Sequence, residues 1–421
     1  MVKTEAFPTI RMKIDRLLKI TNEYQFNDLV KAVYCINLCI NNRSVLESCL
    51  ALNACLIEYE EKGSKRIGTY DEFKGFFEVF GFFEIFNEEN GTLFRSDING
   101  VDPVMRSFPE LLDVGIMGHC NGGQYCRNAG IDCYQKGFTT YAPHMSYENF
   151  MEIVKQAAGK TFQIALGGAG DPNKHPQIED ILKSCRAYRI IPNMTTSGFL
   201  ITDNEVGLIK QYCGAVAVSW YSRFMDGKES NQETIDAVER LVKSGCTTNI
   251  HYVVSKDTIN EAITRLEMDS FPKGVNAVIF ILYKPVGNGI IEKVLKNTDS
   301  RIERFISLAT KVKHPYRVGF DTCFTPALLR WGDTVPAVSI DACEAATFSM
   351  YIDSQMNCYP CSFGIWDKSI SESMNSKTLR EIWQGDKFVA FREQRKEKCS
   401  SCRQMELCRG GCRLGIDIDM C

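Results

Sequence analysis

The distribution of cysteine constrains the fold of this chain more than any other feature. Of its 19 cysteines, eight lie between Cys343 and Cys421, where runs of apolar residues are few. A segment of this length with so little apolar content is expected to hold a core poorly, so another source of order is needed. Bound metal clusters are the obvious candidate.

Composition and charge predict a soluble cytoplasmic protein. The 421 residues suffice for about three domains. The 49 basic and 52 acidic residues nearly cancel, which does not favour a nucleic-acid surface. No uncharged apolar run reaches the roughly 18 residues that span a bilayer, and charges scattered through residues 1–13 argue against a signal peptide. Cytoplasmic thiols stay reduced, so metal binding or catalysis is expected rather than a disulfide framework.

From residue 110 onward, short apolar runs alternate with stretches of helical period. This alternation predicts β/α units with parallel strand pairing, and six units suffice for an incomplete barrel with the loops after the strands on one face. Strands are expected near 112–117, 162–166, 190–194, 215–219, 248–254 and 278–282, and helices near 147–158, 178–188, 204–212, 232–243 and 260–268. A last unit starts near 317–321, and residues 341–421 are expected to be loop-rich with one helix near 379–394.

Residues 1–105 are expected to be mostly helical. Apolar positions recur near helical spacing at 45–56 and again at 73–80. Seven cysteines are most simply core residues, because a reduced cysteine packs as a small apolar side chain. They are Cys35, Cys39, Cys49, Cys55, Cys185, Cys213 and Cys246.

Three cysteines, Cys120, Cys126 and Cys133, lie in one glycine-rich loop after the first expected barrel strand. Three thiolates from such a loop can hold three irons of a [4Fe-4S] cube and leave the fourth iron open to an outside ligand. A different metal, or cysteines without a metal, remain alternatives for this triplet taken alone.

A second set of cysteines follows the spacing Cys399-x2-Cys402-x5-Cys408-x3-Cys412, with Cys421 beyond it. This spacing predicts metal ligands. A zinc ribbon is the alternative, because a four-cysteine zinc site also uses a two-residue gap. Cys343, Cys358 and Cys361 lie upstream of this set.

Over residues 105–421 these motifs resemble the radical SAM superfamily, in which a [4Fe-4S] cluster binds S-adenosylmethionine (SAM), together with the SPASM extension of peptide maturases. Two departures stand out. The gaps in the triplet are five and six residues where the superfamily usually has three and two, and Met356 stands where SPASM sequences usually place glycine.

The resemblance implies SAM and three [4Fe-4S] clusters as cofactors. The segment 167–172, Gly-Gly-Ala-Gly-Asp-Pro, is similar to the superfamily's SAM-binding motif after the second strand. The implied SAM contacts are Tyr134, Gly167, Gly168, Ala169, Asp171, Thr196, Ser197 and Ser219. The implied cluster ligands are Cys120, Cys126 and Cys133 for the SAM cluster, Cys399, Cys402, Cys408 and Cys421 for one auxiliary cluster, and Cys343, Cys361 and Cys412 for the other, with Cys323 or Cys358 as fourth ligand or with an open iron.

Three domains follow from the same resemblance. Residues 1–105 form a helical domain that recognises a leader peptide or caps the barrel, residues 106–322 form a partial (β/α)6 TIM barrel of radical SAM type, and residues 323–421 form the SPASM domain. The family's usual recognition module is a winged helix that opens with strands, and no such strands are evident in the pattern.

The implied activity is that of a peptide maturase. Reductive cleavage of SAM gives a 5′-deoxyadenosyl radical, which takes a hydrogen from a precursor peptide, and a thioether or carbon–carbon crosslink forms while an auxiliary cluster accepts an electron. The expected partners are a precursor peptide with a leader and a reductant such as flavodoxin or ferredoxin, with no nucleic acid and no membrane.

Other functions remain open. A sulfatase-maturating enzyme is disfavoured because Ser362 follows Cys361 where that branch has an aspartate base, and a peptide epimerase is a further alternative. A multi-cluster electron carrier or a zinc-scaffolded interaction protein would be functions of another class. No general base is identified, and Lys284 and His251 are expected to have ordinary packing or surface roles.

Overall fold

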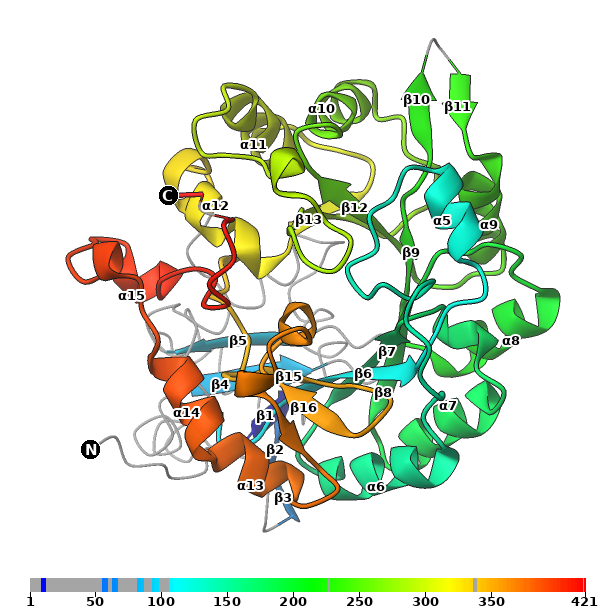
Figure 1. The fold of residues 1–421 in the computed structure, drawn as a ribbon, viewed down its shortest axis with the longest axis vertical. Helices are drawn as coiled ribbons and strands as arrows, with labels where there is room; N and C mark the ends of the chain where they lie inside the picture. The colour runs from blue at the N-terminus through cyan, green and yellow to red at the C-terminus, as the bar shows by residue number, and fades with distance from the viewer. Residues whose placement is uncertain are drawn as a thin grey trace.

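The computed structural model describes residues 106–421, except 226–227, 336–338 and 419, and five short strands before residue 106. A curved ten-stranded sheet forms the centre of the molecule (Figure 1). Seven consecutive strands of this sheet form the barrel and pair in parallel, for example with Val114 opposite Leu166. In spatial order they are β6 (Leu111–Met117), β7 (Gln163–Gly168), β8 (Ile191–Thr196), β9 (Val216–Ser219), β12 (Thr248–Val254), β13 (Ala277–Leu282) and β14 (Arg317–Phe320). The predicted partial barrel is confirmed.

Helices connect the parallel strands and lie outside the barrel (Figure 1). The sequence pattern predicted the first five of them to within one residue at each end and missed the last two. They are α6 (Tyr147–Ala157), α7 (Ile178–Ala187), α8 (Asp203–Tyr212), α9 (Gln232–Lys243), α10 (Ile259–Met268), α11 (Arg301–Lys311) and α12 (Thr325–Trp331). Local signals fix their ends. Thr202 accepts a bond from the Glu205 backbone N–H at 3.3 Å, and the Glu205 carboxylate accepts one from the Thr202 N–H at 2.6 Å, which is a capping box.

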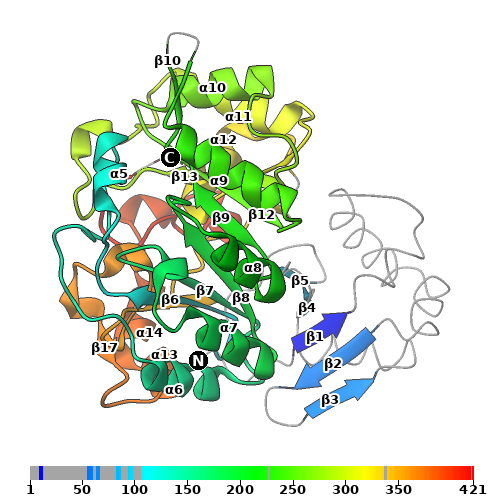
Figure 2. The same ribbon diagram turned by 90° about the vertical axis from the view of Figure 1, so that its right-hand side faces the viewer.

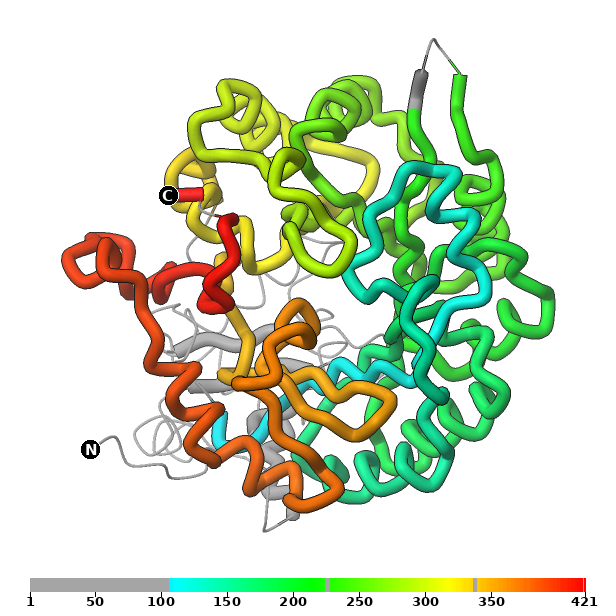
Figure 3. The backbone as a smooth tube through the Cα atoms, in the orientation of Figure 1, coloured from blue at the N-terminus to red at the C-terminus, as the bar shows by residue number. Residues whose placement is uncertain are grey.

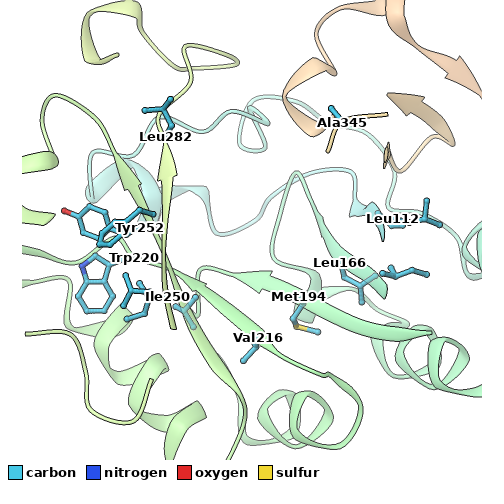
Figure 4. Close-up of a cluster of buried hydrophobic side chains, with 14 of the residues drawn as sticks. Leu112, Leu166, Met194, Val216, Trp220, Ile250, Tyr252, Leu282 and Ala345 are labelled. Carbon is cyan, nitrogen blue, oxygen red and sulfur yellow. The ribbon is translucent and has the colours of Figure 1, made fainter. Parts of the chain in front are cut away.

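Each barrel strand contributes apolar side chains to one continuous core. Leu112, Leu166, Met194, Val216 and Ile250 come from five neighbouring strands and are buried (Figure 4). Burying one such side chain stabilises the fold by about 1.5–3 kcal/mol. The barrel is therefore a packed scaffold whose strand ends are held in fixed positions.

The C-terminal segment extends the same sheet. Strand β15 (Ser349–Ile352) pairs in parallel with β6, with Ser349 opposite Leu111, and β16 (Asn357–Tyr359) and β17 (Glu372–Ser373) follow in antiparallel pairing. The chain then runs through α13 (Leu379–Gln384), α14 (Asp386–Glu393) and α15 (Met405–Cys408). In Figures 1 and 3 this orange-to-red segment covers the open side of the barrel between β6 and α12.

Two predictions for this segment are wrong. It does not lack a core, because Trp383, Phe388 and Phe391 are buried in the same cluster as the barrel strands. The few apolar side chains suffice because they pack on an existing core rather than form their own. The single helix expected near 379–394 is two helices, because Gly385 takes an extended conformation with ψ 160° between them.

Trp383 is expected to be the strongest single contact between this segment and the barrel. Its side chain is fully buried, and its indole N–H donates to the Arg106 carbonyl at 3.1 Å. We expect Trp383→Ala to destabilise the fold by about 3–5 kcal/mol, measured by urea unfolding at equal iron content. Trp366→Ala is the control, since Trp366 is 43% exposed, and equal losses for the two variants would contradict this account.

The N-terminal region contains strands that the sequence analysis did not find. Three of them, β1 (Thr9–Met12), β2 (Cys55–Tyr59) and β3 (Gly63–Arg66), form an antiparallel sheet, and β4 (Phe82–Phe86) and β5 (Leu93–Asp97) form a hairpin. Figure 2 shows β1–β3 to one side of the barrel strands.

The mostly helical prediction is therefore wrong for these stretches, including Cys55 and Leu56 at the start of β2. Ile57 and Tyr59 favour a strand, and pairing with β1 and β3 outweighs an apparent helical period. The expected helical stretch 73–80 and Cys35, Cys39 and Cys49 lie outside the described residues.

Candidate functional site

The loop after β6 brings Cys120, Cys126 and Cys133 close to one another. Cys126 lies on the short helix α5 (Gly123–Asn128), and the Cys120 N–H donates to the Gly137 carbonyl at 2.8 Å, which closes the loop. Burial, reinforced by the neighbouring charges of Asp171, Cys120 and Cys133, raises the pKa of Cys126 to about 12. The ionised thiolates would repel one another, and a bound cation or iron-sulfur cluster would stabilise them.

This loop packs directly on the glycine-rich end of β7. The Ala169 N–H donates to the Met117 carbonyl at 2.8 Å. A side chain at Gly170 would place its Cβ 2.6 Å from the His119 carbonyl oxygen, and Gly168 has a φ of +118°. Only glycine fits such an approach without displacing the neighbouring backbone. Gly168, a predicted SAM contact, and its neighbour Gly170 therefore also shape the cysteine loop.

Asp171, Thr196 and Ser197 form one hydrogen-bond network at the ends of β7 and β8. The Asp171 carboxylate accepts bonds from the Ser197 backbone N–H, at 2.7 Å, and from its hydroxyl. The Thr196 hydroxyl donates to Asn173 at 2.8 Å. Burial raises the pKa of Asp171, and the bonds from Ser197 partly offset that effect. The predicted polar contacts thus lie together and hold two strand ends in register.

Sequence reasoning missed Tyr221, which follows the predicted contact Ser219. The Tyr221 hydroxyl hydrogen-bonds with Ser219 and with the Cys126 thiol, and burial raises its pKa well above the ordinary value. An aromatic residue two positions beyond the end of β9 was the available signal.

Tyr134, another predicted SAM contact, packs against the C-terminal segment. Its ring centroid lies 4.7 Å from that of Phe363, and its carbonyl accepts a bond from the Trp366 indole at 2.9 Å. It therefore connects the cysteine loop to the C-terminal segment.

Four cysteines from distant parts of the chain meet beside the carboxyl ends of β13 and β14. We call Cys323, Cys343, Cys361 and Cys412 the four-cysteine group. The Cys323 and Cys412 thiols hydrogen-bond, which raises the pKa of Cys323 and lowers that of Cys412. Burial, with the nearby charge of Cys323, raises the pKa of Cys343 to about 11, and Cys361 is adjacent to both.

Cys358 does not join this group. It lies on β16 opposite Ile352, is fully buried, and has Asp353 and Glu372 as its charged neighbours. Strand pairing holds it in the sheet. Of the two alternatives for a fourth ligand, the geometry favours Cys323.

The residues around the four-cysteine group fit an anionic cluster. The Nε and Nη1 atoms of Arg413 are buried without a hydrogen-bond partner in the described part of the chain. Burial lowers the pKa of Arg413, while Cys343 and Cys412 raise it. A buried donor without an acceptor costs about 1–3 kcal/mol. The sulfide and thiolate sulfurs of an iron-sulfur cluster are acceptors that would satisfy these donors.

The remaining predicted ligands lie near the C-terminus. Cys408 interacts with Cys399 and Cys421, and burial raises its pKa. Cys402 follows one turn after Cys399, with its N–H donating to the Cys399 carbonyl at 3.2 Å. Three left-handed residues, Arg409, Gly410 and Gly411, turn the chain between Cys408 and Cys412. This turn separates the two cysteines into different groups, as the SPASM resemblance implies.

Among the described residues, no three histidine, cysteine, aspartate or glutamate side chains converge on a point where one metal ion would fit. Ligands of a cube need not converge in this way, because each binds a separate iron. The described part of the chain also contains no helix long and apolar enough to cross a membrane.

A pocket opens between the cysteine loop and the carboxyl ends of β9, β12 and β13. It is lined by Ile131, Asp132, Tyr221, Arg223, Tyr283 and Lys293, among others. Lys293 forms an ion pair with Asp132 at 2.6 Å. Tyr221 and three residues of the cysteine loop, Gly130, Ile131 and Asp132, line the pocket, which makes it the candidate substrate pocket.

Comparison with known proteins supports the domain and the fold. Residues 343–409 match the SPASM family, described as an iron-sulfur cluster-binding domain. The structure resembles that of SuiB from Streptococcus suis, solved with its precursor peptide SuiA, with a TM-score of 0.57, 18% identity and coverage of 74% of this chain and 73% of that one. The predicted SPASM domain and the predicted barrel fold are confirmed by these comparisons.

Two curated proteins are also similar in sequence. A cysteine-type anaerobic sulfatase-maturating enzyme of Clostridium perfringens is 30% identical over 70 residues, which are 16% of this chain and 19% of that enzyme. The region of this chain that matches spans about a fifth of the length of that relative. The tungsten-containing aldehyde ferredoxin oxidoreductase cofactor-modifying protein of Pyrococcus furiosus is 21% identical over 316 residues, covering 66% of this chain and 84% of that protein.

Proposed function

We propose that this protein is a cytoplasmic radical SAM peptide maturase that crosslinks a precursor peptide, forming a thioether or a carbon–carbon bond. The observation that carries the proposal is the placement of three thiols at the carboxyl end of β6, against the glycine-rich end of β7 and beside an open pocket. Cys120, Cys126 and Cys133 would hold a SAM-binding cluster in that loop.

SAM on this cluster would supply a carbon radical that removes one hydrogen atom from the peptide. The chain's own residues provide the setting. The Asp171–Ser197 network holds the strand ends, and Tyr221 covers Cys126. The peptide gives up one hydrogen atom, one thiol proton and one electron as the C–S bond forms, so the product is lighter by two hydrogens. The four-cysteine group would hold the cluster that accepts the electron, and Cys399, Cys402, Cys408 and Cys421 would hold the third.

The N-terminal strands favour leader recognition over a simple cap. An antiparallel sheet has open edges, and an extended peptide can add to such an edge as a further strand. SuiB has been solved with its precursor peptide, which makes a leader-bearing peptide the leading candidate substrate. An external reductant such as flavodoxin or ferredoxin would supply the electron for SAM cleavage.

Formylglycine formation in a sulfatase is the second candidate. It is favoured by the 70-residue similarity to the Clostridium perfringens enzyme. It is disfavoured by Ser362, which stands after Cys361 where an aspartate base is expected. A hydroxyl does not replace a carboxylate as a proton acceptor at neutral pH.

One assay separates these candidates. The full chain, reconstituted anaerobically, is incubated with SAM, dithionite and the precursor peptide encoded beside its gene, and the peptide is analysed by mass spectrometry. We expect loss of two hydrogens with retention of the sulfur, and no change in a precursor whose acceptor cysteine is serine if the bond is a thioether. A sulfatase peptide that loses its sulfur would support the second candidate, and intact SAM would refute both.

A further inference from the structure

A lysine that the proposed chemistry does not use lies beside the four-cysteine group. Lys284 follows β13, and its side chain is 1% exposed. Its ammonium donates to the Asp321 carboxylate at 2.6 Å and to the Leu282 carbonyl at 2.8 Å, and lies 4.3 Å from the Phe363 ring centroid. The ion pair with Asp321 keeps the ammonium charged in its buried position.

Asp321 only partly cancels this charge at the cysteines. Its side chain is 21% exposed, so water screens it more than it screens Lys284. Lys284 lowers the pKa of both Cys323 and Cys361, and at Cys323 its effect is larger than the opposing effect of Asp321. The net field of the pair at the four-cysteine group is therefore positive.

Arg413 adds a second buried cation to the same group. It follows Cys412 directly, and it interacts with Cys343 as well as Cys412. Two of its nitrogens lack a partner among the described residues. Arg392 repels it from a neighbouring position, and burial together with that repulsion lowers the pKa of Arg392 to about 10. This concentration of positive charge is costly unless an anion is bound.

We propose that Lys284 and Arg413 are fixed positive charges that raise the reduction potential of an iron-sulfur cluster bound by Cys323, Cys343, Cys361 and Cys412. This inference rests on the proposed function, because the cluster belongs to it. Reduction adds one negative charge to the cluster, and a nearby buried cation stabilises the reduced form more than the oxidised form. The two side chains act through the cluster and do not touch the substrate. They would make this cluster the preferred acceptor of the electron released during crosslinking.

The test is a redox titration of the full chain, followed by electron paramagnetic resonance. Cys120, Cys126 and Cys133 are replaced by alanine in every sample, so only auxiliary clusters contribute. We expect Lys284→Met and Arg413→Gln each to shift the reduction equilibrium at least tenfold toward the oxidised cluster, which is about 59 mV for a one-electron couple. Asp321→Asn should shift it in the opposite direction.

The matched control is Lys311→Gln, which removes a lysine paired with Asp333 on the surface. It should leave the potential unchanged. Iron and sulfide are counted for every variant. If Lys284→Met and Arg413→Gln keep their clusters and the potential is unchanged, this proposal is overturned while the proposed function stands. The same holds if Asp321→Asn shifts the potential in the same direction as the two cation variants. Absence of iron from the four-cysteine group in the parent protein would overturn the cluster assignment and this proposal together.

Discussion

Replacing Cys120, Cys126 and Cys133 together by alanine is expected to reduce SAM cleavage to background. These thiols are the ligands of the proposed SAM cluster. The loop between β6 and α6 contains no other cysteine. Three cubes contain about twelve irons, so the variant should retain about eight. Deoxyadenosine release measures activity, and iron and sulfide counts measure the clusters.

The matched control removes three other cysteines, Cys185, Cys213 and Cys246, by the same substitution. They lie in or against the apolar core, where burial raises the pKa of each. This control should keep its iron and its SAM cleavage, with only a loss of stability. Full iron content in the Cys120, Cys126 and Cys133 variant would show that this loop holds no cluster.

The second large effect distinguishes Cys323 from Cys358. We expect Cys323→Ala to lose peptide crosslinking almost completely, because one corner of the cluster at the four-cysteine group loses its ligand. Cys358→Ala should keep its clusters and its crosslinking, and lose about 1–2 kcal/mol of stability, since it removes one buried sulfur from β16.

Crosslinked product, iron content and thermal midpoint are measured for both variants. SAM cleavage should survive in Cys323→Ala, because the SAM cluster is separate. The opposite pattern, with crosslinking lost in Cys358→Ala alone, would refute the assignment.

The barrel was predictable because its signals are local. Helix α9 begins at Gln232 and ends at Lys243 as the sequence pattern predicts, since its buried residues recur with helical period. Most strands of the barrel coincide with short apolar runs that can be read directly from the sequence. The three-cysteine loop was equally visible, because all its thiols lie within one connection.

The rest depended on contacts between distant residues. Cys323 meets Cys412 across the fold, and Cys358 is kept from the group by strand pairing that no local pattern shows. Tyr221 and Lys284 likewise gain their roles only from their neighbours. In the N-terminal region, the pairing of β1 with β2 outweighs a local helical period.

Met356 shows how a departure from a family pattern is tolerated. It has a φ of +67° at the position where SPASM sequences usually have glycine. A bulky residue there carries backbone strain of about 1–2 kcal/mol. Its side chain is 3% exposed, and burying a methionine contributes a similar or larger amount. The local preference for glycine is thus offset by packing.

The pairing of β15 with β6 has a consequence for synthesis in the cell. On the ribosome, β6 emerges before every other barrel strand and β15 after all of them. Until β15 arrives, one edge of β6 has open N–H and C=O groups, and such an edge invites pairing with other nascent chains. The strand that leads into the cysteine loop therefore gains its second neighbour only after the C-terminal segment has been synthesised.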